Sequence, residues 1–373
     1  MMSTKVLTSL VVLCCLSAVW AMPGDLVLMK DGISMGAVCL DGTPPGYYFR
    51  PGSGSGRSKL IMHMEGGGWC YNEDDCVGRS KTNLGSSKNW GPTASFNGFL
   101  SDDPQLNPLF YNWTLVFLKY CDGASFAGNV DKVVNWKDTD LHFRGFRILD
   151  LAVESVKSIA NFSEVILTGC SAGGLATYIH TDYVASKFPG ATFHAIADAG
   201  YFIDANNVNG EPLIRKEYQY VFKMQNCAGG VNQDCVKDLS PKGEEWKCFF
   251  PQYTEPYIKN KLFGLNSQYD TWQLGNILQL PCNPPKCTPD QMKLLENFGK
   301  EFLEAAADFI AGDSRGFFFD SCLHHCQSLG GEWTNIMVNG QRANETFATW
   351  YYEGSGSGSG REVDCAYPCN HSC

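Results

Sequence analysis

Residues 165–180 restrict the possible folds more than any other part of this 373-residue chain. They read VILTGCSAGGLATYIH, which predicts a buried strand, a tight turn and a helix in succession. GCSAG at 169–173 matches G-x-S-x-G, and strand, turn and helix are the context that a nucleophile elbow requires. The turn is so sharp that flanking side chains would collide, hence the glycines, and it lifts the serine hydroxyl to the positive end of the helix. We therefore expect Ser171 to be a nucleophile and not a bystander in a glycine-rich turn.

Short apolar runs alternate with longer helical patterns on both sides of this segment. The alternation is typical of a mostly parallel sheet covered by helices, so we predict an α/β-hydrolase-like fold with disulfide-stapled loops. Residues 78–105 and 203–260 are rich in Ser, Asn and Gly and are expected to be insertions that form a lid or a pocket wall. The expected strands are 59–64, 113–120, 164–168, 193–197, 261–265 and 316–319, and the expected helices are 143–160, 172–188 and 290–311.

A nucleophilic serine needs a base, and the base needs a carboxylate that orients it. α/β-Hydrolases supply them in the order Ser, acid, His, each after a later strand. Apart from the tail residue His371, only His324 and His325 follow the last expected strand, and chain order does not choose between them. Asp270, two strands after the serine, is the favoured acid, and Asp198 is the alternative. The other histidines precede the serine, lie in its helix or the next strand, or belong to the tail: His63, His142, His180, His194 and His371.

The oxyanion of an acyl-transfer intermediate needs N–H groups aimed at it in advance. EGGGW at 65–69 follows an expected strand and is glycine-rich like the HGGG-type loops. A flexible turn is the plain alternative, but the place between a strand and Cys70 favours a fixed loop. We predict donors at Gly67, Gly68 and Ala172. Four aromatic residues are candidates for the substrate pocket, with core packing an equal alternative for each: Trp69, Phe126, Tyr201 and Trp272.

The N-terminus predicts secretion. Lys5, an apolar run over 6–20 and Ala21 have the pattern of a signal peptide at 1–21. The run is shorter than the roughly twenty residues that span a bilayer, so we expect cleavage, no membrane span and an extracellular protein. One esterase-type domain is expected at 22–353, then a GSGSGSG tether at 354–360 and a Cys-rich tail at 361–373 that packs on the domain.

The cysteine content supports an oxidising compartment. Of 17 cysteines, Cys14 and Cys15 leave with the signal peptide, and the odd number that remains leaves at least one thiol unpaired. We expect that thiol to be Cys170, buried and inert. Local staples are expected where cysteines are close in sequence: Cys70–Cys76, Cys282–Cys287 and among Cys365, Cys369 and Cys373. Four N-x-S/T sequons are candidate glycosylation sites: Asn112, Asn161, Asn344 and Asn370.

The net charge of −10 argues against nucleic acid or an anionic membrane surface as the main partner. It offers no long-range attraction to a polyanionic substrate either, although Arg144 and Arg147 are a candidate basic patch. We also expect no metal site. Four clustered residues invite a metal interpretation (Cys322, His324, His325 and Cys326), but cysteines in an oxidising compartment are expected to form disulfides.

Eight segments together resemble the pectin acetylesterase family, which also includes the Notum-type carboxylesterases. They follow one another along nearly the whole chain beyond the signal peptide, so the resemblance is specific. EGGGWC and GCSAGGLA are closer to the plant-type pectin acetylesterases. The segments are MEGGGWCYNEDDC (64–76), YCDGASFAG (120–128), LHFRG (141–145), LTGCSAGGLATYIH (167–180), DAGYFID (198–204), YDTWQ (269–273), SCLHHCQ (321–327) and DCAYPCNHSC (364–373).

The resemblance implies an α/β-hydrolase fold with a Ser-Asp-His triad and no cofactor. The acid of the Y-D-x-W segment is Asp270, and the histidine that precedes Cys-Gln is His325, which is thereby preferred to His324. The family's oxyanion glycines correspond to Gly67 and Gly68, and the tail motif D-C-x-Y-P-C implies disulfides there. The tether and much of 203–260 match no family segment that we identify. The resemblance therefore predicts the reaction chemistry more firmly than the substrate.

Two substrates fit this chemistry, and we expect a monomer in either case. The favoured reaction removes O-acetyl groups from a pectin-like polysaccharide. The alternative, as in Notum-type members, removes a fatty acyl group of the palmitoleoyl type from a secreted protein and needs a deep apolar pocket. A catalytically inactive binding protein on the same scaffold is a remote third possibility, against which the complete Ser, Asp and His set speaks.

Overall fold

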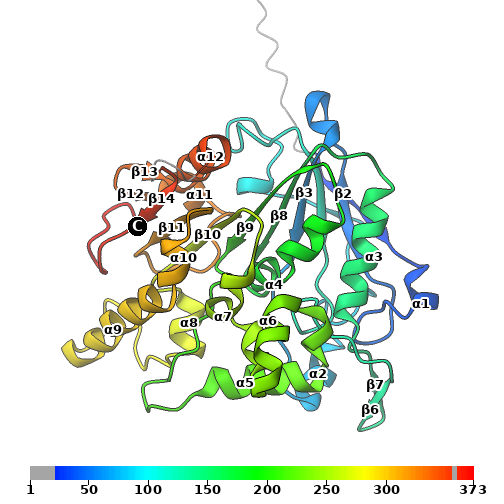
Figure 1. Ribbon diagram of the computed structural model, residues 1–373, viewed down its shortest axis with the longest axis horizontal. Coiled ribbons are helices and arrows are strands. Elements are labelled where there is room, and N and C mark those ends of the chain that lie inside the picture. Colours follow the sequence, from blue (N-terminus) through cyan, green and yellow to red (C-terminus); the bar gives the residue numbers. More distant parts are fainter. Residues whose placement is uncertain (1–21, 355–358) are drawn as a thin grey trace, which may run out of the picture.

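A ten-stranded sheet runs through the centre of the structure, a computed structural model that describes residues 22–354 and 359–373 (Figure 1). The expected signal peptide and residues 355–358 of the tether lie outside the described residues. Seven strands are parallel and three antiparallel strands extend one edge. In spatial order the strands are β14 (Arg361–Val363), β11 (Arg315–Asp320), β10 (Leu262–Ser267), β9 (Thr192–Asp198), β8 (Glu164–Cys170), β3 (Lys59–Met64), β5 (Thr114–Leu118), β2 (Gly46–Arg50), β1 (Gly24–Leu28) and β4 (Thr93–Ala94).

Both faces of the sheet are covered, because its central strands are apolar at successive positions. In β3, Leu60 and Met62 face one hydrophobic core while Ile61 faces the other. Helices α3 (Gly145–Lys157) and α4 (Ala172–Ser186) contribute to the first core. Helices α11 (Glu332–Asn335) and α12 (Ala343–Glu353) contribute to the second. The predicted fold class and all six predicted strands are confirmed.

One helix differs from the sequence-based expectation. The long helix expected at 290–311 is interrupted at Ala306, which gives α9 (Pro289–Ala305) and α10 (Ala307–Ala311). The segment at 203–260, expected to be an insertion that forms a lid or a pocket wall, is largely helical. It forms α5 (Leu213–Met224), α6 (Gln233–Leu239) and α7 (Pro251–Thr254), and a Cys235–Cys248 disulfide fastens it.

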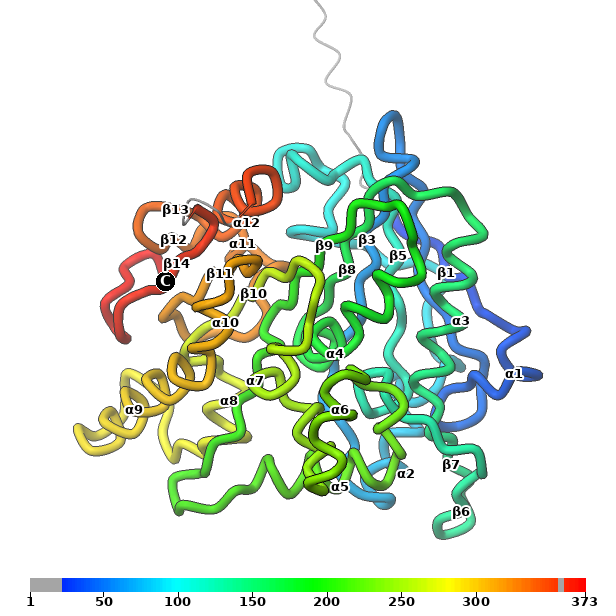
Figure 2. The backbone as a smooth tube through the Cα atoms, in the orientation of Figure 1, coloured from blue at the N-terminus to red at the C-terminus, as the bar shows by residue number. Residues whose placement is uncertain are grey.

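These insertion helices gather with α2 (Glu73–Arg79) and α8 (Thr271–Asn276) at the lower end of the sheet in Figure 1. The tube in Figure 2 shows the same grouping, with 203–260 in green beside α4. Parallel sheets bind ligands beyond the carboxyl ends of their strands, and β3 leads into α2 at this end. The rest of the chain forms two hairpins, β6 (Val134–Trp136) with β7 (Thr139–Leu141) and β12 (Met337–Val338) with β13 (Gln341–Arg342), and the short α1 (Gly32–Met35).

Seven disulfides link the described chain, and one of them corrects the sequence-based expectation. Cys170 is not the unpaired cysteine: it bonds to Cys326, and the free thiol is the buried Cys227. Sequence spacing gave no sign of this bond because its partners are 156 residues apart. The other bonds are Cys39–Cys121, Cys70–Cys76, Cys235–Cys248, Cys282–Cys287, Cys322–Cys373 and Cys365–Cys369.

The tail packs on the domain through β14 and the Cys322–Cys373 bond. Within the described residues, no helix has the length and apolar character needed to cross a membrane. Of the four sequons, Asn161 is exposed, whereas Asn112, Asn344 and Asn370 are half-buried. The amide nitrogen of Asn370 also donates to Met337 O and to Asp364.

Candidate active site

Ser171 lies in the turn between β8 and α4 with a backbone that ordinary residues avoid. Its φ is 60° and its ψ is −125°, and its N–H donates to Asp198 O at 2.9 Å. A Cβ at position 169 would lie 2.2 Å from Gly173 O, and one at 173 would lie 2.0 Å from Met64 O. Only glycine fits at positions 169 and 173, and these two glycines allow the close packing that holds Ser171 in its strained conformation.

Asp270 and His325 form a buried carboxylate–imidazole pair. Asp270 is fully buried at the N-cap of α8, where Oδ1 accepts from Gln273 N at 3.0 Å. Its Oδ2 lies 2.7 Å from His325 Nδ1. Burial by itself would lower the pKa of His325, but the hydrogen bond and charge of Asp270 outweigh it and raise that pKa. The pairing at Nδ1 leaves Nε2 free for proton transfer.

The Cys170–Cys326 disulfide brings this pair to the serine. Cys170 directly precedes Ser171, and Cys326 directly follows His325. A ring nitrogen of His325 and the two sulfur atoms all lie within 4.8 Å of one another. No hydrogen bond joins Ser171 to His325 within the described chain, and such bonds are often long before substrate binds.

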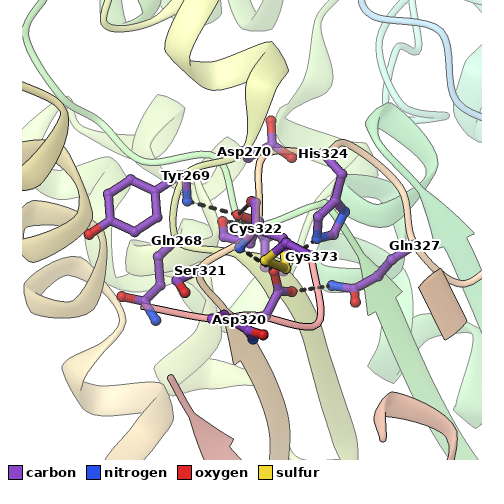
Figure 3. Close-up of polar contacts among 12 residues, drawn as sticks. Gln268, Tyr269, Asp270, Asp320, Ser321, Cys322, His324, Gln327 and Cys373 are labelled. Atoms are coloured by element: carbon purple, nitrogen blue, oxygen red, sulfur yellow. Dashed lines mark hydrogen bonds and ion pairs between the residues drawn. A yellow bond between two sulfur atoms is a disulfide. The ribbon is translucent and has the colours of Figure 1, made fainter. Parts of the chain in front are cut away.

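Two buried carboxylates hold the loop at 321–328, which we call the histidine loop. Asp320 accepts from Cys322 N, His324 Nε2 and Gln327 Nε2 at 2.8–2.9 Å (Figure 3). Asp198 accepts from Gln327 N and from the N–H and hydroxyl of Ser328. Asp198, the alternative acid, is therefore bound to Gln327 and Ser328 and makes no hydrogen bond to either histidine within the described chain, although its charge contributes to the raised pKa of both.

His324 points away from Asp270 and forms its own pair with Asp320 (Figure 3). Burial opposes protonation of His324, but the charge and hydrogen bond of Asp320 outweigh it and raise its pKa to about 9. An imidazolium at neutral pH cannot act as a base, so the geometry distinguishes the two adjacent histidines that chain order left equal.

The glycines at 66–68 lie against the elbow. A Cβ at Gly66 would lie 2.9 Å from Ser171 Cβ and 2.3 Å from Cys170 O. Gly67 and Gly68 have φ values of 137° and 66°, which glycine alone adopts readily. Within the described residues, no acceptor takes the N–H of Gly67, Gly68 or Ala172. These groups remain available to a negatively charged oxygen beside Ser171.

Aromatic rings fill the space between this loop and the base. Trp69 meets Phe202 and Trp272 edge to face at centroid distances of 5.0 and 5.5 Å, and those two rings are 5.1 Å apart. Phe202 and Trp272 lie 6.4 and 6.5 Å from the His325 ring. We call Trp69, Phe202 and Trp272 the aromatic wall. Tyr218 of α5 supports it from behind, 4.9 Å from Trp69.

The other two aromatic candidates belong to the core. Phe126 is fully buried beside Tyr120, and Tyr201 packs on Tyr178 and Phe302. Arg144 and Arg147 do not form an open basic patch: Arg144 is buried and donates to the backbone carbonyl of Asp131, and Arg147 pairs with the Asp131 carboxylate. The cysteines that invited a metal interpretation, Cys322 and Cys326, are both disulfide-bonded.

Comparison with known proteins identifies the family. A family model described as pectinacetylesterase matches residues 19–373. This chain belongs to the pectinacetylesterase family. It is therefore a carboxylic ester hydrolase.

The relatives found for this chain fall into two groups. Pectin acetylesterase 5 from Arabidopsis thaliana is 36% identical over 94% of this chain and 86% of its own length. Palmitoleoyl-protein carboxylesterase NOTUM from Homo sapiens is 27% identical over 85% of this chain and 64% of its own length. A solved structure of the Wnt deacylase Notum from Drosophila shares the fold with a TM-score of 0.82 at 23% identity, covering 94% of this chain and 100% of that one.

Several parts of this site were not predicted from the sequence. Tyr218 comes from the unmatched insertion, and Phe202, although it lies in the DAGYFID segment, was not among the candidate residues. The Cys170–Cys326 bond did leave a signal, since one cysteine adjoins each of Ser171 and His325. This adjacency is visible in the sequence once Ser171 and His325 are identified as candidate catalytic residues.

Proposed function

We propose that the protein is a secreted serine esterase that removes O-acetyl groups from a pectin-like polysaccharide, with Ser171, His325 and Asp270 as its triad. The buried Asp270–His325 pair beside the strained Ser171 elbow supports the esterase chemistry. The higher identity to Arabidopsis pectin acetylesterase 5 than to human NOTUM supports a carbohydrate ester. No cofactor is needed for this reaction.

In the first half of the reaction, Ser171 Oγ attacks the ester carbonyl carbon while His325 Nε2 takes the hydroxyl proton. Asp270 stabilises the imidazolium through Nδ1. N–H groups of Gly67, Gly68 and Ala172 receive the oxyanion. The carbon–oxygen bond to the sugar then breaks, and His325 protonates the departing sugar hydroxyl, which leaves an acetyl group on Ser171.

In the second half, His325 removes a proton from water, which attacks the acetyl carbonyl carbon. Collapse of that intermediate breaks the bond to Ser171 Oγ, and His325 returns the proton to the serine. Acetate leaves and the free enzyme is restored.

The observation that favours acetyl over a fatty acyl chain is the aromatic wall. Rings in edge-to-face contact at 5.0–5.5 Å leave no channel between them for a long chain. A two-carbon acyl group needs no such channel. A palmitoleoyl-type substrate on a secreted protein, suggested by the NOTUM relatives, requires the wall to open.

The test is hydrolysis of p-nitrophenyl esters from acetate to palmitate by the mature protein and by Ser171→Ala. We expect kcat/KM to be highest for acetate and to fall with chain length. Ser171→Ala should lose at least about three orders of magnitude in kcat. A preference for octanoate or longer esters would favour the fatty acyl alternative, and an active Ser171→Ala variant would contradict the proposed nucleophile.

A further inference from the structure

Two side chains bind consecutive carbonyls of the loop at 66–69, which we call the oxyanion loop. Arg79 Nη1 donates to Gly67 O at 2.8 Å. The Tyr120 hydroxyl donates to Gly68 O, also at 2.8 Å. Neither side chain has a role in the triad. Tyr120 begins the YCDGASFAG segment and Arg79 lies just beyond MEGGGWCYNEDDC, but neither was among the candidate site residues.

These contacts fix the direction of two N–H groups. In a trans peptide the carbonyl of one residue and the N–H of the next point to opposite sides. Holding Gly67 O and Gly68 O therefore turns the N–H groups of Gly68 and Trp69 the other way. No acceptor in the described part of the chain takes either N–H, and a Cβ at Gly68 would meet open space.

Both side chains are themselves held in place. The Arg79 guanidinium lies over the Tyr120 ring at 4.9 Å, and its Nε donates to Leu84 O at 3.0 Å. Arg79 ends α2, which the Cys70–Cys76 bond ties to the end of the oxyanion loop.

Tyr120 is fully buried, and its backbone N–H donates to Glu65 Oε2 at 2.8 Å. Its hydroxyl accepts from Ser125 N at 3.0 Å. Glu65, the residue before the oxyanion loop, also pairs with Lys119. The loop is therefore held on both flanks as well as at its carbonyls.

We propose that Arg79 and Tyr120 are positioning residues for the oxyanion hole, a role that rests on the proposed esterase function. They aim the Gly68 N–H, already proposed as a donor, and the Trp69 N–H, a further candidate donor, at the oxygen that becomes negative beside Ser171. The positive charge of Arg79 adds to this effect. A charged donor on Gly67 O polarises the shared peptide and makes the Gly68 N–H a stronger donor.

The test compares Arg79→Met and Tyr120→Phe with Arg147→Met as a matched control. Arg147 is also a hydrogen-bonded arginine, but its recorded partners are Asn129 and Asp131. Because loss of a whole oxyanion donor costs about 10²–10³ in kcat, we expect a fall of about tenfold to a hundredfold in kcat on p-nitrophenyl acetate. KM should stay within about twofold, because the contacts that bind the substrate before the reaction are not changed. The control should keep wild-type kcat.

Two further readouts separate positioning from stability. The affinity for phenylboronic acid, which forms a tetrahedral adduct with a nucleophilic serine, should weaken by about the same factor as kcat. Guanidinium chloride at millimolar concentration should restore part of the activity of Arg79→Ala. Arg79→Lys, which keeps the charge, should lie between wild type and Arg79→Met if the other variants fold poorly.

Unchanged kcat and boronate affinity in folded Arg79→Met and Tyr120→Phe would overturn the positioning role. So would an equal fall in Arg147→Met, or a rise in KM alone. If the wild-type protein shows no Ser171-dependent turnover, the proposed function itself fails and the positioning role with it. Wild-type activity with unaffected variants overturns only the role of Arg79 and Tyr120.

Discussion

At the scale of single residues, the hydrogen-bond partners of each group around Ser171 restrict that group to one role. Asp270 uses one oxygen to cap α8 and the other to hold His325. His324, one residue away, is held by Asp320 and stays charged at neutral pH. The difference between the two histidines therefore comes from which carboxylate each one meets, and not from their position in the chain.

The pKa of His325 predicts the pH dependence of the reaction. The base acts only when neutral, and the pKa is raised above its ordinary 6.5 because Asp270 outweighs burial. We expect kcat/KM on p-nitrophenyl acetate to rise with pH through a midpoint above 6.5. Asp270→Asn should move the midpoint to lower pH and reduce kcat by about 10³–10⁴. A wild-type midpoint below 6.5 would contradict the assigned pair.

Trp272 is the wall residue whose removal should change acyl selectivity. It is half-buried, whereas Phe202 is fully buried, so truncation at 272 opens a space beside His325 at the smaller structural cost. We expect Trp272→Ala to raise the ratio of kcat/KM for octanoate over acetate by at least about tenfold, since each buried methylene contributes about 0.8 kcal/mol. The exposed Trp136→Ala is the control and should leave the ratio unchanged.

At the scale of elements, the site depends on how the elbow meets the histidine loop. The elbow joins β8 to α4, and the histidine loop leaves β11, three strands away in the sheet. The Cys170–Cys326 bond crosses this gap next to both reacting side chains. The insertion helix α5 adds Tyr218 behind the aromatic wall. The disulfide and α5 therefore both shape the space around the proposed triad.

Removing the Cys170–Cys326 bond should affect catalysis as well as stability. In the Cys170→Ser/Cys326→Ser variant we expect kcat to fall at least about tenfold, because the base is no longer tied to the nucleophile. The free energy of unfolding should fall by about 2–5 kcal/mol. The Cys235→Ser/Cys248→Ser variant removes a bond in the insertion and should lose stability while keeping kcat. Equal kcat in both variants would show that the bond serves stability alone.

At the scale of the whole molecule, charge works against a polyanionic substrate. The chain carries −10, and in the one basic patch that the sequence suggested Arg144 is buried and Arg147 is paired with Asp131. A de-esterified pectin carries many carboxylates, so approach of enzyme and polymer is opposed by repulsion that salt screens.

We therefore expect kcat/KM on acetylated polygalacturonate to rise severalfold from about 10 to about 150 mM salt, over which the Debye length falls from about 30 to about 8 Å. Hydrolysis of the neutral p-nitrophenyl acetate over the same range is the control and should not change. A fall in activity on the polymer with added salt would instead indicate a basic binding surface.

Much of the fold was predictable because it rests on local patterns. The strands β3, β8 and β9 were expected within two residues of their observed ends, since each is a continuous apolar run between polar turns. The antiparallel strands β1 and β2 were missed. β1 is only partly buried, so its apolar pattern is weak, whereas β2 lies between β5 and β1, is largely buried, and was not singled out as an apolar run.

The sequence by itself determined the elbow, its glycines and the order of the candidate catalytic residues, because these depend on neighbours in the chain. Only the tertiary structure decided that His325 meets Asp270, that Cys170 bonds to Cys326, and that Arg79 and Tyr120 hold the oxyanion loop. The residues in each of these contacts are 55, 156, 12 and 52 positions apart. Which of many possible partners lies within hydrogen-bonding distance follows from how the strands and insertions pack together. The resemblance of the Y-D-x-W and H-C-Q segments favoured Asp270 and His325, but their contact depends on that packing.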